Sequence, residues 1–413
     1  MNKAITSTLS YVFFSGISQL LSLLFMLTLM YQLDITEFSK YNVVVSLVSI
    51  FSFLIDGGLT GYIIKEYNKK NYDIYIHSED KNEFITGVVN YQVLFTLLLI
   101  SLYTLVAYIY SNSESFNSYF VFGLLTLSTG LFNPLFAIFL AEQKRIFIII
   151  KDLAVSLVRL GILWLLVISS KRLELIYYIP ACSFLVCLVF FAFIKHKIDF
   201  RYIKGNILDV SLIKNVAYSV LPFLLLALFN IVYNKVDILM LEKLSESTEV
   251  GFYAGATIFV YPFMFICSAA SSVILPILTR NQSSKSIVNH EKSLIIFMSI
   301  IGLILSLVLF VFSSFFYENL FDGKYFQSLN VYRVLVWYLA VVFTYTVLSN
   351  SMIASGKVNT LIVMNIIMLI CNVILNIQLI PYYGAIGAAW STLFSEALIL
   401  FFMFYYKFKL KYA

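Results

Sequence analysis

Apolar stretches of about 20 residues or more recur along the whole chain, and short segments rich in charged residues separate them. A helix needs roughly 20 mostly apolar residues to cross the hydrocarbon core of a bilayer. The composition agrees, because 61% of the 413 residues are hydrophobic and only 12% are charged, whereas about 25% are charged in a typical soluble domain. The pattern predicts a protein that crosses a membrane many times.

Breaking the sequence at charged and turn-rich clusters predicts an all-α membrane protein of about twelve transmembrane helices. Strands of a membrane barrel would be only about 10 residues long and would alternate in polarity, whereas these stretches are longer and continuously apolar. The first stretch is too long for a signal-peptide core and is expected to remain as a helix. The predicted helices cover residues 9–31, 41–64, 85–110, 119–141, 146–169, 174–194, 212–234, 250–278, 293–317, 328–353, 358–380 and 383–406.

Lysine and arginine are distributed unequally between the two sets of predicted loops. One set carries 20 of the 28 basic residues and the other carries six, while Arg159 and Arg333 lie within predicted helices. Basic loops stay on the cytoplasmic side of a membrane. We therefore expect a multi-pass protein of the bacterial inner membrane with both termini in the cytoplasm. The same asymmetry accounts for the net charge of +6 without a nucleic-acid partner.

Two short matches indicate that the chain is built twice. Thr36-Glu37 corresponds to Thr248-Glu249 at an offset of 212 residues, and Ala141 to Lys144 corresponds to Ala354 to Lys357 at an offset of 213. An offset of six helices keeps the membrane orientation, so the repeat is parallel and its lobes can rock to give alternating access. The expected lobes are residues 1–194 and 212–413, joined by a cytoplasmic linker at 195–211.

Three segments carry a resemblance to a known family. Residues 52–67 contain an apolar run, Gly58-Leu59 and then charge; residues 230–254 run through Asp237 to Tyr253; and residues 383–389 precede Trp390. These segments resemble the end of the second helix, the connection of helices 7 and 8, and the start of helix 12 in Wzx-type flippases of O-antigen and capsule polysaccharide. Those flippases belong to the multidrug and oligosaccharidyl-lipid exporter superfamily.

The resemblance implies a substrate and a direction of transport. The substrate would be an oligosaccharide linked to undecaprenyl pyrophosphate, moved from the cytoplasmic to the periplasmic leaflet, with membrane lipid and other polysaccharide assembly proteins as further partners. It also implies a cationic central cavity and, for some members, coupling to a proton or sodium gradient. No cofactor is expected.

Polar side chains inside the predicted helices are the candidates for such a cavity, because a charge at the bilayer centre costs about 2.5–3.5 kcal/mol on insertion scales. Asn230, Asn234 and Asp237 are spaced to share one helix face. The alternative for the asparagines and serines is ordinary hydrogen bonding between helices. The candidates for substrate binding are Arg159, Lys235, Asp237, Arg333, Asp56, Glu396, Asn230, Asn234, Gln19 and Asn372.

Arg159 lies near the middle of an otherwise apolar helix. An arginine stays charged at any physiological pH, so it requires an internal anion, buried carbonyls or water. One interpretation is a structural ion pair with Glu396 or Asp152. The other is that Arg159 faces the cavity and binds the pyrophosphate, since a planar guanidinium suits phosphate oxygens.

Three other functions compete with flipping. A membrane glycosyltransferase or polymerase would need catalytic residues in sizeable outer loops, and no P-loop, zinc spacing or nucleophile elbow supports an enzyme. A drug or metabolite exporter of the same superfamily would share the fold, because function depends on the site. A scaffold without transport is disfavoured by the charges within the membrane.

The charge asymmetry predicts the topology directly. Reporter proteins fused after Asn112 and after Asp322 should report a periplasmic location, and a fusion after Asn206 should report the cytoplasm. A cytoplasmic signal at Asn112 would overturn the orientation.

Overall fold

The computed structural model of the protein describes residues 2–72, 78–111, 116–142, 144–168, 173–194, 210–280, 286–319 and 323–412, and these residues contain helices and no strand. The all-α prediction is therefore confirmed. Most of the predicted linker at 195–211 lies outside the described residues. Within the described part, nine helical segments are long and apolar enough to cross a membrane: 13–32, 35–64, 84–110, 116–141, 175–193, 247–275, 291–311, 326–354 and 358–407.

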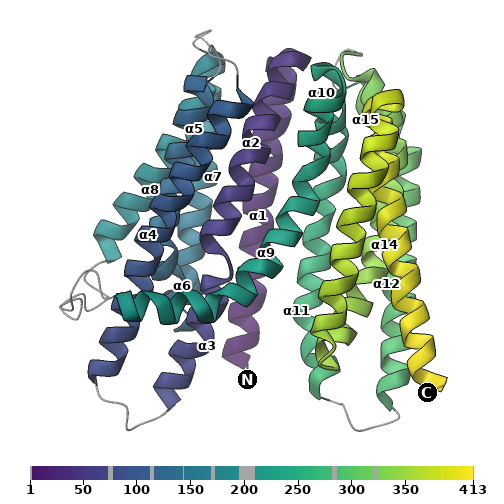
Figure 1. The fold of residues 1–413 in the computed structure, drawn as a ribbon. Helices are drawn as coiled ribbons and strands as arrows, with labels where there is room; N and C mark the ends of the chain where they lie inside the picture. The colour runs from purple at the N-terminus through teal and green to yellow at the C-terminus, as the bar shows by residue number, and fades with distance from the viewer. Residues whose placement is uncertain are drawn as a thin grey trace. The chain divides into compact units, whose positions relative to one another are not determined.

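The described residues of the first half of the chain form eight α-helices, whose course can be followed in Figure 1. They are α1 (Asn2–Gln32), α2 (Ile35–Asp56), α3 (Leu59–Tyr72), α4 (Ser78–Tyr110), α5 (Phe116–Ser128), α6 (Asn133–Ala141), α7 (Arg145–Ile168) and α8 (Ile179–Ile194). Short 3-10 segments at Thr129–Phe132 and Leu173–Tyr178 precede α6 and α8.

The second half comprises α9 (Val210–Leu244), α10 (Ser247–Val260), α11 (Met264–Arg280), α12 (Ser286–Val311), α13 (Ser313–Asn319), α14 (Phe326–Ala354) and α15 (Val358–Tyr412). A 3-10 turn at Tyr261–Phe263 separates α10 from α11, and Pro262 within it accounts for the break, because proline cannot continue the hydrogen-bond ladder. Helix α7 covers the expected helix 146–169, α9 covers 212–234, and the long α15 covers both 358–380 and 383–406. The count of twelve membrane crossings and the parallel repeat stay predictions.

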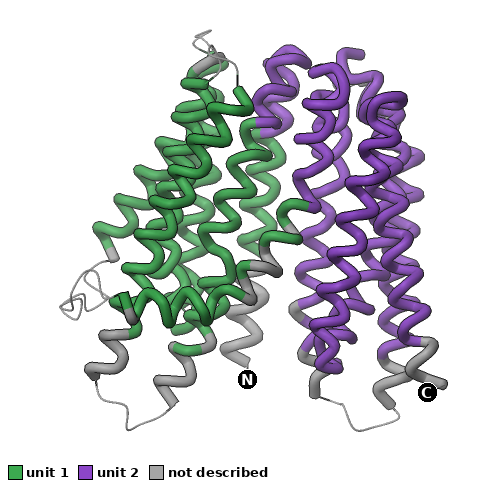
Figure 2. Tube along the Cα trace, viewed as in Figure 1, with its two compact units in different colours: residues 1–25, 44–232 green, residues 26–43, 233–413 purple. Residues whose placement is uncertain are grey.

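Contacts divide the chain into two compact units (Figure 2). Unit 1 comprises residues 1–25 and 44–232, and unit 2 comprises residues 26–43 and 233–413. Unit 2 thus includes the end of α1 and the start of α2, while the first part of α9 belongs to unit 1. The contact units differ in these segments from the predicted lobes 1–194 and 212–413.

In unit 1, the side chain of Gln92 on α4 forms hydrogen bonds at two places where other helices are interrupted. Helix α2 ends at Asp56, and Gly57 and Gly58 follow with φ angles of 42° and 79°, values that favour glycine. The fully buried Gln92 donates its amide to the carbonyl oxygens of Ile55 (3.3 Å) and Gly130 (2.7 Å). The Ile55 carbonyl lies in the last turn of α2, where a helix leaves carbonyl groups free, whereas the Gly130 carbonyl also accepts the backbone N–H of Asn133.

In unit 2, α14 packs against α10, α11, α12 and α15. Two tyrosine side chains form hydrogen bonds to backbone carbonyls of other helices in this region. The buried Tyr317 donates its hydroxyl to the carbonyl oxygen of Gly255 (3.1 Å), and Tyr332 donates to that of Leu309 (3.3 Å). A Cβ atom at Gly302 would lie 2.8 Å from the Cβ of Phe343, so glycine is needed for the close approach of α12 and α14.

Helix α15 is interrupted at Gly384, whose φ of 53° and ψ of −132° are not helical. We call residues 358–383 its first arm and residues 385–412 its second arm. Glu249 of α10 accepts a hydrogen bond from the backbone N–H of Ala385 (2.6 Å). This bond caps the start of the second arm, where a negative charge is favourable. Two segments that carried the family resemblance, 230–254 and 383–389, therefore meet at this break.

We predict that Gly384→Ala destabilises the protein by about 1–3 kcal/mol, because the new residue would be held in a strained backbone conformation. Its Cβ would also lie 2.3 Å from Oε2 of Glu249. The measurement is thermal unfolding of the purified protein in detergent. Gly161→Ala is the matched control, since no atom lies within 4 Å of its added Cβ. Equal unfolding temperatures for the two variants would contradict the role of Gly384.

Candidate functional site

A buried carboxylate, Asp237 of α9, lies at the centre of a polar cluster in unit 2. Its Oδ2 atom accepts hydrogen bonds from the hydroxyls of Tyr253 (2.8 Å) and Thr392 (2.7 Å), and its Oδ1 accepts one from the amide of Asn376 (2.7 Å). Asn376 also donates to Oδ1 of Asn372 (3.1 Å). Asp237 is 4% exposed, and both asparagines are fully buried. We call these five residues the Asp237 cluster.

The helix break at Gly384 assembles this cluster. Asn372 and Asn376 lie one turn apart on the first arm of α15, whereas Thr392 lies on the second arm. Both arms therefore contact the same carboxylate on α9, and Tyr253 approaches it from α10. A straight helix would carry these side chains progressively farther apart, at about 1.5 Å per residue.

The charge of Asp237 has no cationic counterpart among the described residues. Its hydrogen-bond donors are neutral, and none of the salt bridges formed by described side chains includes it. Burying an ionised carboxylate is costly unless a positive charge compensates it. The cluster is therefore suited to hold either a proton or a small cation.

The remaining atoms of the cluster favour oxygen coordination. Oδ1 of Asn376 is buried without a hydrogen-bond partner. The Nδ2 of the same amide contacts Oδ1 of Asp237 and Oδ1 of Asn372, and the Thr392 hydroxyl contacts Oδ2 of Asp237. Carboxylate, amide and hydroxyl oxygens are the ligands that hard cations prefer. A single carboxylate matches a monovalent cation best, and the described residues contain no group of three acidic, histidine or cysteine side chains able to hold a metal ion.

Glu396 is a second buried acid in unit 2. It follows Thr392 by one turn on the second arm of α15, is 4% exposed, and its Oε2 has no hydrogen-bond partner. Its neighbour Ser395 lies 3.4 Å from the hydroxyl of Tyr233, which is one turn from Asp237 on α9. Glu396 therefore lies one turn along α15 from the Thr392 hydroxyl that contacts Asp237.

In unit 1, Arg159 connects α7 to α8. Its Nε donates a hydrogen bond to the hydroxyl of Ser183 (2.6 Å), which is 3% exposed. Asp152, one of the two carboxylates considered as its partner, pairs with Lys151 (2.8 Å). The guanidinium is therefore held at the α7–α8 contact, and its role in binding stays a prediction.

The other charged candidates lie in separate places. Asp56 accepts a hydrogen bond from Thr60 (2.6 Å) at the end of α2. Arg333 donates to Ser313 (3.4 Å) and Ser314 (3.1 Å), which tie it to α13. Lys235 is half-buried.

The predicted stripe on α9 is divided. Asn234 is exposed whereas Asp237 is buried, since residues three apart differ by about 60° around a helix. Gln19 is also exposed. The side chain of Asn230 lies outside the described residues. Of the predicted candidates, the structure brings Asp237 and Asn372 together.

Sequence reasoning missed Tyr253 and Thr392 as partners of Asp237. Tyr253 follows Glu249 by one turn in α10, and Thr392 lies one turn before Glu396. Either position could have been noted as a polar group inside an apolar helix. Nothing local indicates, however, that the two hydroxyls meet the same carboxylate.

Comparisons with known proteins give a consistent family and fold. Residues 4–282 match the family described as "Polysaccharide biosynthesis protein". The capsular polysaccharide biosynthesis protein CapF of Staphylococcus aureus is 20% identical over 337 residues, covering 78% of this chain and 82% of that protein.

Two solved structures show the same fold at low sequence identity. Lipid II flippase MurJ in an inward closed conformation has a TM-score of 0.75 and 15% identity, and the match covers 96% of this chain and 87% of the other. An inward-facing multidrug resistance MATE family transporter of the MOP superfamily has a TM-score of 0.66 and 11% identity, covering 94% and 93%.

Proposed function

Because the chain belongs to the family of polysaccharide biosynthesis proteins, we propose that it is a membrane transporter that moves a lipid-linked saccharide between leaflets. The observation that carries this proposal is the family match over residues 4–282. The fold supports it, since the similar structures include a lipid II flippase and a multidrug transporter.

We further propose a specific substrate and compartment for this transporter. The substrate is a capsule or O-antigen repeat unit linked to undecaprenyl pyrophosphate, and it moves to the periplasmic leaflet of the inner membrane by alternating access. Arg159 supplies a positive charge within the membrane that suits a phosphate group. No step of this movement requires covalent chemistry, so the protein acts as a transporter rather than an enzyme.

The Asp237 cluster gives this transporter a means of coupling to an ion gradient. A bound proton or sodium ion would neutralise Asp237, and Asn376, Asn372 and Thr392 would provide the surrounding oxygens. Because the cluster joins α9, α10 and both arms of α15, occupancy would change the packing of four helical segments of unit 2. A ligand shifts a conformational equilibrium only when it binds one state more tightly than the other.

The competing function is export of drugs or metabolites, and deletion of the gene separates the two. We expect loss of surface polysaccharide, with lipid-linked repeat units accumulating on the cytoplasmic side of the membrane. The measurement is surface polysaccharide staining together with analysis of the lipid-linked pool. Intact surface polysaccharide and a new sensitivity to cationic drugs would favour the exporter instead.

We also predict that sodium or protons stabilise the purified protein through Asp237. A ligand at ten times its dissociation constant stabilises the folded state by about 1.4 kcal/mol. Thermal unfolding in sodium chloride is compared with that in choline chloride, and then across pH. The stabilisation should disappear in Asp237→Asn and persist in Glu396→Gln, the matched buried acid. If the unfolding temperature of the unmodified protein changes neither with sodium nor with pH, Asp237 is not an ion-binding site.

A further inference from the structure

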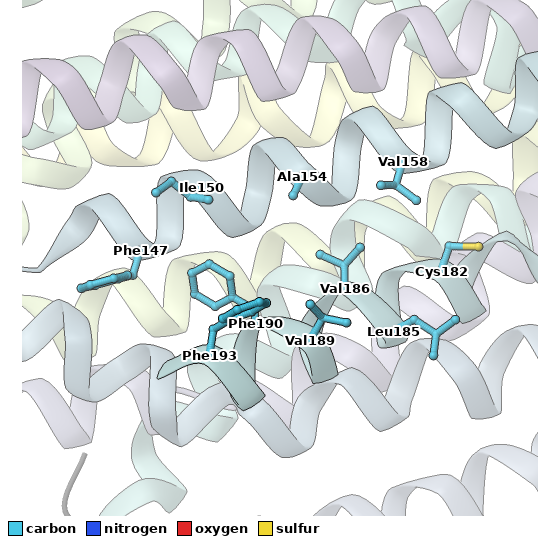
Figure 3. Close-up of a pocket in the computed structure, with 10 residues that line it drawn as sticks. All are labelled: Phe147, Ile150, Ala154, Val158, Cys182, Leu185, Val186, Val189, Phe190 and Phe193. Atoms are coloured by element: carbon cyan, nitrogen blue, oxygen red, sulfur yellow. The ribbon is translucent and has the colours of Figure 1, made fainter. Parts of the chain in front are cut away.

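An apolar groove of about 780 Å³ runs between α7 and α8 in unit 1 (Figure 3). Its volume falls in the range of roughly 300–1,000 Å³ that is common for ligand sites. All of its lining side chains are apolar apart from one thiol: Phe147, Ile150, Ala154, Val158, Cys182, Leu185, Val186, Val189, Phe190 and Phe193.

The groove has the length of a single hydrocarbon chain within one leaflet. On α7 it extends from Phe147 to Val158, and on α8 from Cys182 to Phe193, so each wall is about 16 Å long. The hydrocarbon core of a bilayer is about 30 Å thick. In Figure 3 Val158 and Cys182 mark one end and Phe147 and Phe193 the other. The small side chain of Ala154 leaves the middle of the groove open.

A positive charge lies beside one end of this groove. Arg159 follows Val158 on α7, and Ser183 follows Cys182 on α8; the two are joined by the 2.6 Å hydrogen bond that crosses between the helices. Arg159 is about 21 Å from the start of α7, which places it in the middle of the helix. The site is therefore apolar along its length and cationic at its deep end.

We propose that this groove binds the part of the polyprenyl tail next to the phosphate of the lipid-linked substrate, with the phosphate end at Arg159. This inference rests on the proposed function. Resident phospholipids keep their phosphates at the membrane surface, so they do not bring an anion to the depth of Arg159. A lipid whose head group crosses the membrane must bring its phosphate to that depth while its tail stays in hydrocarbon.

The open face of the groove allows a tail to enter sideways from the bilayer. Phe193 is 77% exposed, Leu185 is 56% exposed and Val189 is 55% exposed. In the described part of the chain these side chains face outward rather than into the core of unit 1. Entry from the side leaves the saccharide free to follow a polar route while the chain slides along α7 and α8.

The test measures binding of undecaprenyl phosphate and of undecaprenol to the purified full-length protein. Ala154→Trp fills the groove and should weaken both probes by on the order of tenfold, and Val189→Trp on the opposite wall should act alike. Arg159→Gln should weaken only the phosphorylated probe, since it removes a charge-assisted hydrogen bond. Leu157→Trp is the matched control, because Leu157 is 56% exposed on α7 but does not line the groove.

Photolabelling with a diazirine on the polyprenyl chain locates the tail. Label on residues 147–158 and 182–193 that excess undecaprenyl phosphate displaces, and phosphatidylethanolamine does not, is the expected result. If the protein binds undecaprenyl phosphate but the label lies elsewhere, the groove assignment is wrong and the proposed function stands. Equal displacement by phosphatidylethanolamine would make the groove a site for bilayer lipid. If the unmodified protein binds neither probe, both proposals fail.

Discussion

Hydrocarbon offers no hydrogen-bond partners, and this constraint explains why buried polar side chains in the described helices contact other helices. Gln92 satisfies two carbonyls where helices end, Tyr317 reaches a carbonyl on another helix, and Asp237 gathers three neutral donors. Each of these side chains joins helices that are remote in sequence. Polar groups therefore define which helices pack together, while the apolar side chains fill the space between them.

The helix breaks matter most for the candidate site. At Gly384 the free backbone N–H of Ala385 is taken by Glu249, and the two arms of α15 then meet Asp237 from different directions. At the end of α2, next to Gly57 and Gly58, Gln92 donates its side-chain amide to the carbonyl oxygen of Ile55. A break in a membrane helix is stable only when other groups replace its lost hydrogen bonds, so such places combine irregular backbone with buried polar chemistry.

The two units carry different chemistry. Unit 2 holds the buried Asp237 among neutral polar side chains, which suits a proton or a small cation. Unit 1 holds Arg159 beside a long apolar groove, which suits an amphiphile with an anionic end. A transporter that is driven by an ion gradient and carries a phosphorylated lipid needs both kinds of site. The proposed function thus assigns ion binding and substrate binding to separate parts of the chain.

The sequence by itself determined the class of fold and the short list of charges inside the membrane, because hydropathy acts locally. It also identified Asp237 and Asn372 as candidates. Only the tertiary structure decided that they belong to one cluster, since Asn376 and Thr392 lie 139 and 155 residues from Asp237. It likewise separated Asn234 from Asp237. Helical periodicity indicates which residues share a face, but which helix meets that face depends on long-range packing.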